Sequence, residues 1–189
     1  MFCDLLGLSA SSFLDSYISQ RGSGKSNRDI IESEGFLGTG DLEDFFRRWM
    51  KAIELPEYLA SDKVLQGVLA WLEANGDNFN LYVCTNRQEK SSTVGQIEEL
   101  GLSQFFVNVL VTEQRFTKAQ LISSSSPNVS PIDWIIGDSP EDVREGKKLG
   151  VRTCAVLTGF TNEALLSIEA PSLILDSLRD FAGIPDVLS

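Results

Sequence analysis

A strand–helix–strand unit at residues 132–160 constrains the fold of this chain more than any other stretch. The apolar run WIIG ends at Gly137, and helix-start residues follow at once. Ser139 suits the N-cap, Pro140 suits the first helical position, and Gly150 suits the residue that ends the helix. The next run, VRTCAVL, has the composition of a buried strand. Units of this kind build parallel sheets, so the stretch predicts an α/β fold.

The order of elements after Val64 extends this prediction to most of the chain. From there on, helical patterns alternate with short apolar runs such as NLYVC, FFVNVLV and SLILD. Such alternation predicts a mostly parallel sheet with helices on both faces, a Rossmann-type arrangement. The first of these helices is expected to turn Leu65, Leu69 and Leu72 inward. A closing helix is expected in SLRDFAGI.

Composition excludes several classes of function. The net charge of −11 argues against nucleic acid and against anionic membrane surfaces as partners. The chain has no histidine, which excludes Ser-His-Asp and Cys-His catalysis and the common histidine-bearing zinc sites. The three cysteines lie in or beside apolar runs, as reduced core residues do. We therefore expect a soluble, cytoplasmic protein without a membrane span.

The segment before Val64 does not alternate between helix and strand. Its strongest pattern is DLEDFFRRWMKAIEL, an amphipathic helix, and it resembles a helical insert after a short first strand. Within it, GSGKS at residues 22–26 resembles the end of a phosphate-binding P-loop. The full motif needs a glycine at Ser19 and a buried strand upstream, and the sequence has neither. A polar loop is the better interpretation.

Polar side chains follow three successive predicted strands. Thr85 and Asn86 end the first, Lys118 follows the second by a loop, and Asp138 and Asp142 follow the third. The carboxyl ends of parallel strands share one edge of the sheet, so these groups are expected to converge. Carboxylates there suit Mg²⁺, while an ammonium and a hydroxyl suit phosphate oxygens. Taken alone, Asp142 also has a purely structural interpretation, as the partner of Ser139 in a capping box.

These residues carry a family resemblance. CTN at 84–86, Lys118, and GDSPED at 137–142 followed by VREGKKLGVRTCAVLTGF resemble the second, third and fourth motifs of the haloacid dehalogenase-like (HAD) hydrolase superfamily. The resemblance covers about residues 60–182. It implies that Thr85, Asn86 and Lys118 bind the phosphate, with Thr85 and Lys118 acting in catalysis. It also implies that Asp138 binds Mg²⁺ with help from Asp142.

The family's first motif is degenerate here. The aligned candidate is DLLGL at residues 4–8. The resemblance implies that Asp4 is the nucleophile and a metal ligand, and that the Leu6 carbonyl is a further ligand. Leu6 stands where phosphatases of the family place the acid/base aspartate, and leucine cannot move a proton.

The resemblance implies a division of the chain and a function. The core domain is expected at residues 1–12 and 66–189, with a small helical cap at 13–65. The implied activity is a Mg²⁺-dependent phosphatase that acts on a small phosphorylated metabolite through an aspartyl-phosphate on Asp4. The alternative is a HAD-like protein that has lost most turnover, because of Leu6, and has a binding or regulatory role. The sequence is silent on oligomeric state.

Overall fold

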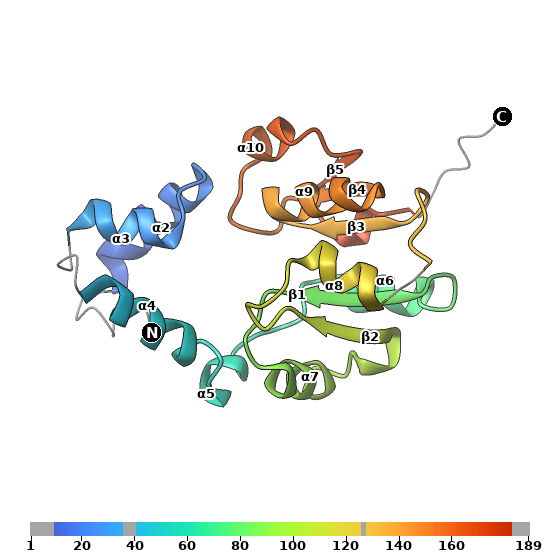
Figure 1. Cartoon of the computed structure of the whole chain (residues 1–189), viewed down its shortest axis with the longest axis horizontal. Coiled ribbons are helices and arrows are strands. Elements are labelled where there is room, and N and C mark those ends of the chain that lie inside the picture. The colour runs from blue at the N-terminus through green and yellow to red at the C-terminus, as the bar shows by residue number, and fades with distance from the viewer. Residues whose placement is uncertain (1–9, 36–40, 126–127, 183–189) are drawn as a thin grey trace.

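The computed structural model describes residues 10–35, 41–125 and 128–182 of the chain. Figure 1 shows helices at one end and an α/β region at the other. The elements are α2 (Ala10–Gly22), α3 (Asn27–Glu34), α4 (Asp41–Ala52), α5 (Pro56–Leu59), α6 (Val68–Asn75), β1 (Leu81–Thr85), α7 (Lys90–Glu99), η1 (Ser103–Phe105), β2 (Phe106–Val111), α8 (Lys118–Ser125), β3 (Trp134–Gly137), α9 (Pro140–Leu149), β4 (Arg152–Val156), α10 (Glu163–Ile168), β5 (Leu173–Leu175) and η2 (Leu178–Asp180).

All described strand pairs are parallel. β1 pairs with β2, and β3, β4 and β5 form a second sheet in that order. α7 and α8 pack on β2, and α9 packs on β3 and β4 (Figure 1). The strand–helix–strand prediction for residues 132–160 is therefore confirmed as β3, α9 and β4.

The strand β4 shows why helices cover both faces. Alternate residues of a strand point to opposite faces, and β4 is buried on both. Cys154 and Val156 join a cluster with Trp71 and Leu72 of α6, while Ala155 joins Val143 of α9 in another. The α6 cluster contains side chains from both sheets. Those of the other strands are Leu81, Phe106, Trp134, Ile136 and Leu175. One apolar layer therefore joins the two sheets. The predicted α/β class is confirmed.

The N-terminal helices have a hydrophobic cluster of their own. Phe13 of α2, Ile30 and Ile31 of α3, and Leu42 and Phe45 of α4 are buried together. We call residues 10–59 the helical region and residues 68–180 the α/β region. Because residues 1–9 lie outside the description, the domain boundaries at 12/13 and 65/66 stay a prediction.

The polar loop at residues 22–26 connects two helices. α2 continues to Gly22, and Ser26 begins α3 with a capping box to Asp29. Gly24 has φ +91°, and an added Cβ would lie 2.9 Å from the Leu165 side chain, so a larger residue would be both strained and crowded. The segment follows a helix, as the interpretation against a P-loop required.

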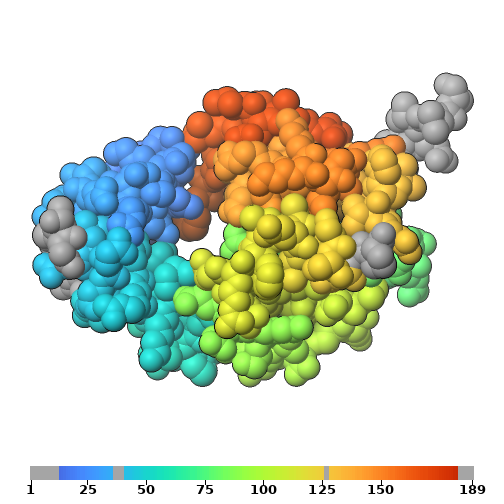
Figure 2. All heavy atoms as spheres, in the orientation of Figure 1, coloured from blue at the N-terminus to red at the C-terminus, as the bar shows by residue number. Residues whose placement is uncertain are grey.

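Contacts between described residues of the helical and α/β regions include two groups. The ring of Tyr17 lies edge-on to the ring of Phe160, with centroids 6.1 Å apart. In the other group, Glu54 and Asp62 contact the segment around Gln88. Figure 2 shows an open space between the regions, with contacts on either side of it.

Two predictions about local structure are wrong. α6 begins only at Val68, because Gly67 takes a left-handed conformation with φ +84° and interrupts the helix. Leu65 and Leu69 are 53% and 42% exposed, while Trp71 and Leu72 are buried, so the inward face differs from the predicted one. The predicted closing helix is a single 3₁₀ turn, η2. No helix in the described ranges is long and apolar enough to span a membrane.

Candidate active site

The carboxyl ends of β1 and β2 bring two of the predicted segments together. Thr85 ends β1, and the N–H of Thr112, just after β2, donates to the Thr85 carbonyl at 3.0 Å. Thr112 is 1% exposed, so this extension of the parallel pairing is buried. The chain then turns through residues 113–117 into α8, whose first residue is Lys118.

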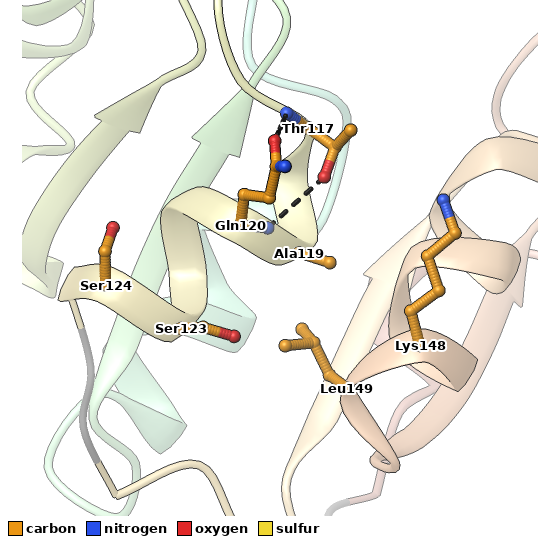
Figure 3. Close-up of a pocket in the computed structure, with 7 residues that line it drawn as sticks. All are labelled: Thr117, Ala119, Gln120, Ser123, Ser124, Lys148 and Leu149. Carbon is orange, nitrogen blue, oxygen red and sulfur yellow. Dashed lines mark hydrogen bonds between the residues drawn. The ribbon is translucent and has the colours of Figure 1, made fainter.

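A capping box fixes the first turn of α8. The Gln120 side chain accepts from the Thr117 N–H at 3.0 Å, and the Thr117 hydroxyl accepts from the Gln120 N–H at 3.2 Å (Figure 3). Such reciprocal bonds satisfy the N–H groups that a helix leaves unpaired at its start. They also fix the direction in which Lys118 leaves the helix.

A second capping box fixes Asp142 at the start of α9. Its Oδ2 accepts from the Ser139 hydroxyl at 2.6 Å, and the Ser139 hydroxyl accepts from the Asp142 N–H at 3.2 Å. Gly137, at the end of β3, is required by this arrangement. A Cβ there would lie 2.3 Å from Asp142 Cγ, so any larger residue would push the carboxylate away.

The two capped helices meet in an ion pair between Lys118 and Asp142. Lys118 Nζ donates to Asp142 Oδ1 at 2.5 Å, and the two side chains are only 15% and 9% exposed. Burial by itself would lower the pKa of Lys118, but the charge and hydrogen bond of Asp142, with smaller contributions from Cys84 and Glu141, together raise it. The lysine is therefore held as a cation. The capping interpretation of Asp142 is confirmed, and its other carboxylate oxygen pairs with Lys118, while its predicted role at a metal site stays a prediction.

Two further carboxylates of α9 accept hydrogen bonds from the segment after β1 and from α8. Asn86 Nδ2 donates to Glu141 Oε1 at 3.0 Å, and the Ala119 N–H donates to Glu145 Oε2 at 2.8 Å. Glu145 is 3% exposed and also pairs with Lys148 at 2.5 Å. Burial would raise the pKa of Glu145, but Lys148, the Ala119 N–H and Thr117 together hold it below its ordinary value.

The sequence analysis missed Glu145. Its one signal was spacing, since a residue three positions after Asp142 lies on the same face of a helix. Its partner, a backbone N–H on another helix, leaves no trace in the sequence.

Asp138 differs from Asp142 in its exposure and in its hydrogen bonding. It is exposed and makes no hydrogen bond or ion pair with any other described residue. Its carboxylate lies against Gly159, where an added Cβ would come within 1.9 Å of Oδ2. A carboxylate at a strand end is the kind of hard oxygen donor that Mg²⁺ takes, so Asp138 fits the ion as one ligand. No group of three His, Cys, Asp or Glu side chains in the described ranges could hold a metal, so such a site needs a further ligand.

Cys84 directly precedes Thr85 in β1 and lacks the properties of a nucleophile. Burial raises the pKa of its thiol to about 11, although Lys118 acts in the opposite direction. A thiol with that pKa is almost fully protonated at neutral pH and is a poor nucleophile. Cys84 and Cys154 are free thiols, as the sequence predicted for core cysteines.

Two hollows lie near α8, and they differ in what lines them. A shallow one of about 680 Å³ lies between α8 and α9 and is lined by Thr117, Ala119, Gln120, Ser123, Ser124, Lys148 and Leu149 (Figure 3). Neither Lys118 nor Asp142 lines it. The other, of about 330 Å³, is lined by Asn86, Thr112, Gln114, Arg115, Phe116, Thr117, Gln120 and Glu141. Because it contains Asn86 and Glu141, it adjoins the ion pair.

Comparisons with known proteins point to a family of hydrolases. The family model described as HAD-hydrolase-like matches residues 115–181. Phosphoglycolate phosphatase 1 of Pseudomonas aeruginosa is 28% identical over 82% of the chain, and phosphoglycolate phosphatase of Rhodospirillum rubrum is 31% identical over 69%. The chain belongs to the HAD superfamily.

Solved HAD structures share the fold. A haloacid dehalogenase-like hydrolase of Streptococcus pneumoniae superposes with a TM-score of 0.72 at 18% identity, over 93% of this chain and 82% of that one. A magnesium-bound HAD-hydrolase of Bacillus subtilis superposes with a TM-score of 0.60 at 17% identity, over 95% of this chain and 85% of that one. The chain spans only 58% and 57% of the two phosphoglycolate phosphatases.

Only part of the HAD site predicted from the sequence lies within the described residues. The structure brings Thr85, Asn86, Lys118 and Asp142 to one edge of the sheets, and Asp138 lies at the end of β3 beside them. Asp4 and Leu6, the predicted nucleophile and its degenerate neighbour, lie outside the described residues. Their roles stay predictions.

Proposed function

We propose that this HAD-like protein is a Mg²⁺-dependent phosphohydrolase that acts on a small phosphorylated metabolite. The observation that carries the proposal is the buried ion pair between Lys118 and Asp142, beside the end of β1 and one turn from the free carboxylate of Asp138. A fixed cation at the sheet edge where β1 ends in Thr85 and β3 is followed by Asp138 is an arrangement suited to a phosphoryl group and its counter-ion.

Each residue has a role in the proposed reaction. Asp4 attacks phosphorus, the bond to the substrate oxygen breaks, and water then hydrolyses the aspartyl-phosphate to release inorganic phosphate. Lys118 and the Thr85 hydroxyl hold the phosphoryl oxygens, and Asn86 adds an amide donor. Asp142 keeps Lys118 in place and charged.

The metal would be held by Asp4, the Leu6 carbonyl and Asp138, with Asp142 supporting them. When bound, Mg²⁺ supplies charge neutralisation for the phosphoryl oxygens. Asp138 has no hydrogen-bond or ion-pair partner in the part of the chain that the structure describes, whereas both oxygens of Asp142 are paired, which supports Asp138 as the direct ligand of the two.

Phosphoglycolate is the first substrate to assay. Both relatives described above are phosphoglycolate phosphatases. The hollow of about 330 Å³ that contains Asn86 and Glu141 suits a small polar ligand better than a large apolar one. In this proposal the helical region acts as the cap over the site.

Leu6 favours a second candidate, a HAD-like protein with impaired turnover. General acid–base catalysis is worth roughly 10²–10⁴ in rate, and leucine provides none. Such a protein would still bind phosphate through Lys118 and Thr85. Its role would then lie in binding or regulation.

Hydrolysis of an aryl phosphate and of phosphoglycolate, with and without Mg²⁺, tests both candidates. Metal-dependent turnover that disappears in Asp4→Asn establishes the phosphohydrolase. If only Leu6→Asp is active, the second candidate is correct. Turnover that survives Asp4→Asn contradicts the assignment of the nucleophile, and absence of turnover in all three proteins contradicts the first candidate.

A further inference from the structure

A buried glutamate joins the helical region to the loop that carries two of the proposed phosphate-binding residues. Glu54 lies between α4 and α5 and is 8% exposed. Its Oε1 accepts from the Gln88 N–H at 2.7 Å, and its Oε2 accepts from the Glu89 N–H at 2.9 Å. Each carboxylate oxygen therefore has its own backbone donor, 34 and 35 residues away.

The two donors lie at the start of α7. Glu89 is the N-cap of that helix and makes no side-chain capping bond. A helix start has unpaired N–H groups and a partial positive charge, so a carboxylate placed there is stabilising. Glu54 provides from the helical region what the sequence of α7 lacks.

The same loop is held at its other end by the α/β region. The Asn86 side chain donates to Glu141, and the Asn86 carbonyl accepts from Gln114 Nε2 at 2.7 Å. Residues 85–89 therefore run from β1 to α7 with one anchor in each region. Exposed contacts of Asp62 with Arg87 and Gln96 lie beside the Glu54 contact and reinforce it.

We propose that Glu54 is a positioning residue, which ties the placement of the helical region to the geometry of the Thr85–Asn86 loop. The reason is energetic. If the helical region moved while the loop stayed, a buried carboxylate and two N–H groups would lose their partners together. A displacement of the helical region therefore either shifts the Glu54 end of the loop with it or breaks these bonds. The link to phosphate binding rests on the function proposed above.

The test uses Glu54→Gln in the full chain, with Glu57→Gln as the matched control. An amide keeps the shape of the carboxylate but turns its NH₂ group toward one of the two N–H donors, so one bond is lost. Glu57 is exposed and in the next helix, and its variant removes the same charge without touching the loop. Glu54→Asp, which keeps the charge on a shorter side chain, is a second variant.

Amide hydrogen exchange at Gln88 and Glu89 is the first readout. We expect it to be about tenfold faster in Glu54→Gln, intermediate in Glu54→Asp and unchanged in Glu57→Gln, with amides of β4 unaffected in all three. Unchanged exchange at Gln88 and Glu89 in Glu54→Gln would overturn the proposal.

The second readout is phosphate binding and kinetics. Calorimetry measures the affinity for inorganic phosphate in the presence of Mg²⁺, and an assay with the aryl phosphate gives KM and kcat. We expect about tenfold weaker phosphate binding in Glu54→Gln at an unchanged unfolding midpoint. Faster exchange with unchanged phosphate affinity and kinetics would reduce Glu54 to a helix cap and also overturn the proposal. If the natural protein neither binds phosphate nor turns over, the proposed function fails, and the exchange comparison alone decides whether Glu54 holds the loop.

Discussion

The two sides of the candidate site contribute opposite chemistry. We call the side formed by β1, β2 and α8 the donor side. It contributes the Asn86 amide, the Lys118 ammonium and the Ala119 N–H. The side formed by β3, β4 and α9, here the acceptor side, meets these groups with three carboxylates of α9. The two sheets are not paired to each other in the described residues, so hydrogen bonds and the α6 apolar layer join them.

The difference between the sides shows which carboxylates are available for chemistry. Glu141, Asp142 and Glu145 each have a partner on the donor side, whereas Asp138 has none among the described residues. Three of the four acidic groups therefore hold the site together, and the fourth is free to bind. Substitutions on each side can separate these two roles.

Lys118→Met should have the largest effect. Methionine keeps the apolar stem but leaves Asp142 Oδ1 buried without its cation, and breaking a buried pair typically costs about 3 kcal/mol of unfolding free energy or more. Arg48→Met is the control, because Arg48 and its partner Asp44 are 59% and 48% exposed in their ion pair, and the variant should cost less than about 1 kcal/mol. Urea unfolding measures both. Equal losses in the two variants would show that the Lys118 pair is no more than a surface contact.

Glu145→Ala should have the next largest effect. It leaves the buried Ala119 N–H without an acceptor, at a cost of about 2 kcal/mol. Glu141→Ala is the control, because Glu141 is exposed and its partner Asn86 can turn to water. A similar loss in both variants would contradict the special role of the Ala119 contact.

The pH dependence of stability gives a second test of Glu145. Its folded pKa is lowered, so its contribution is present above the ordinary carboxyl pKa of about 4.3 and is lost as the pH falls through the folded pKa. Glu145→Gln should therefore lose less stability than the natural protein on acidification. Parallel acid-unfolding curves for the two proteins would contradict this.

Much of the site could be predicted from the sequence because its parts are set locally. The capping box of Ser139 and Asp142 and the left-handed Gly150 define α9 within a dozen residues, and strand ends in a parallel sheet bring Thr85 and Lys118 together. The predicted start of α6 is wrong because the prediction followed the leucine pattern through Gly67. The glycine itself was a local signal of a helix boundary, since it takes a left-handed conformation there.

Other features could not be predicted because they depend on distant backbone groups. Glu54 and Glu145 bind N–H groups 34, 35 and 26 residues away, and a backbone N–H has no residue type to recognise. The different states of Asp138 and Asp142 were also hidden. Both are aspartates near a helix start, and their surroundings differ in burial, in the Lys118 partner of Asp142 and in the glycine that packs against each.

Gly159→Ala should have the smallest effect on stability. It should nevertheless change the position of the Asp138 carboxylate on the acceptor side. Its Cβ would displace the Asp138 carboxylate, which is exposed and can swing toward water, so the cost should stay below about 1 kcal/mol. Mg²⁺ affinity, measured by calorimetry, should nevertheless fall toward that of Asp138→Asn. Gly137→Ala is the matched comparison, because its Cβ would meet the buried, fully paired Asp142 and should cost far more stability. If Gly159→Ala binds Mg²⁺ as the natural protein does while Asp138→Asn does not, Asp138 binds from a position that Gly159 does not define.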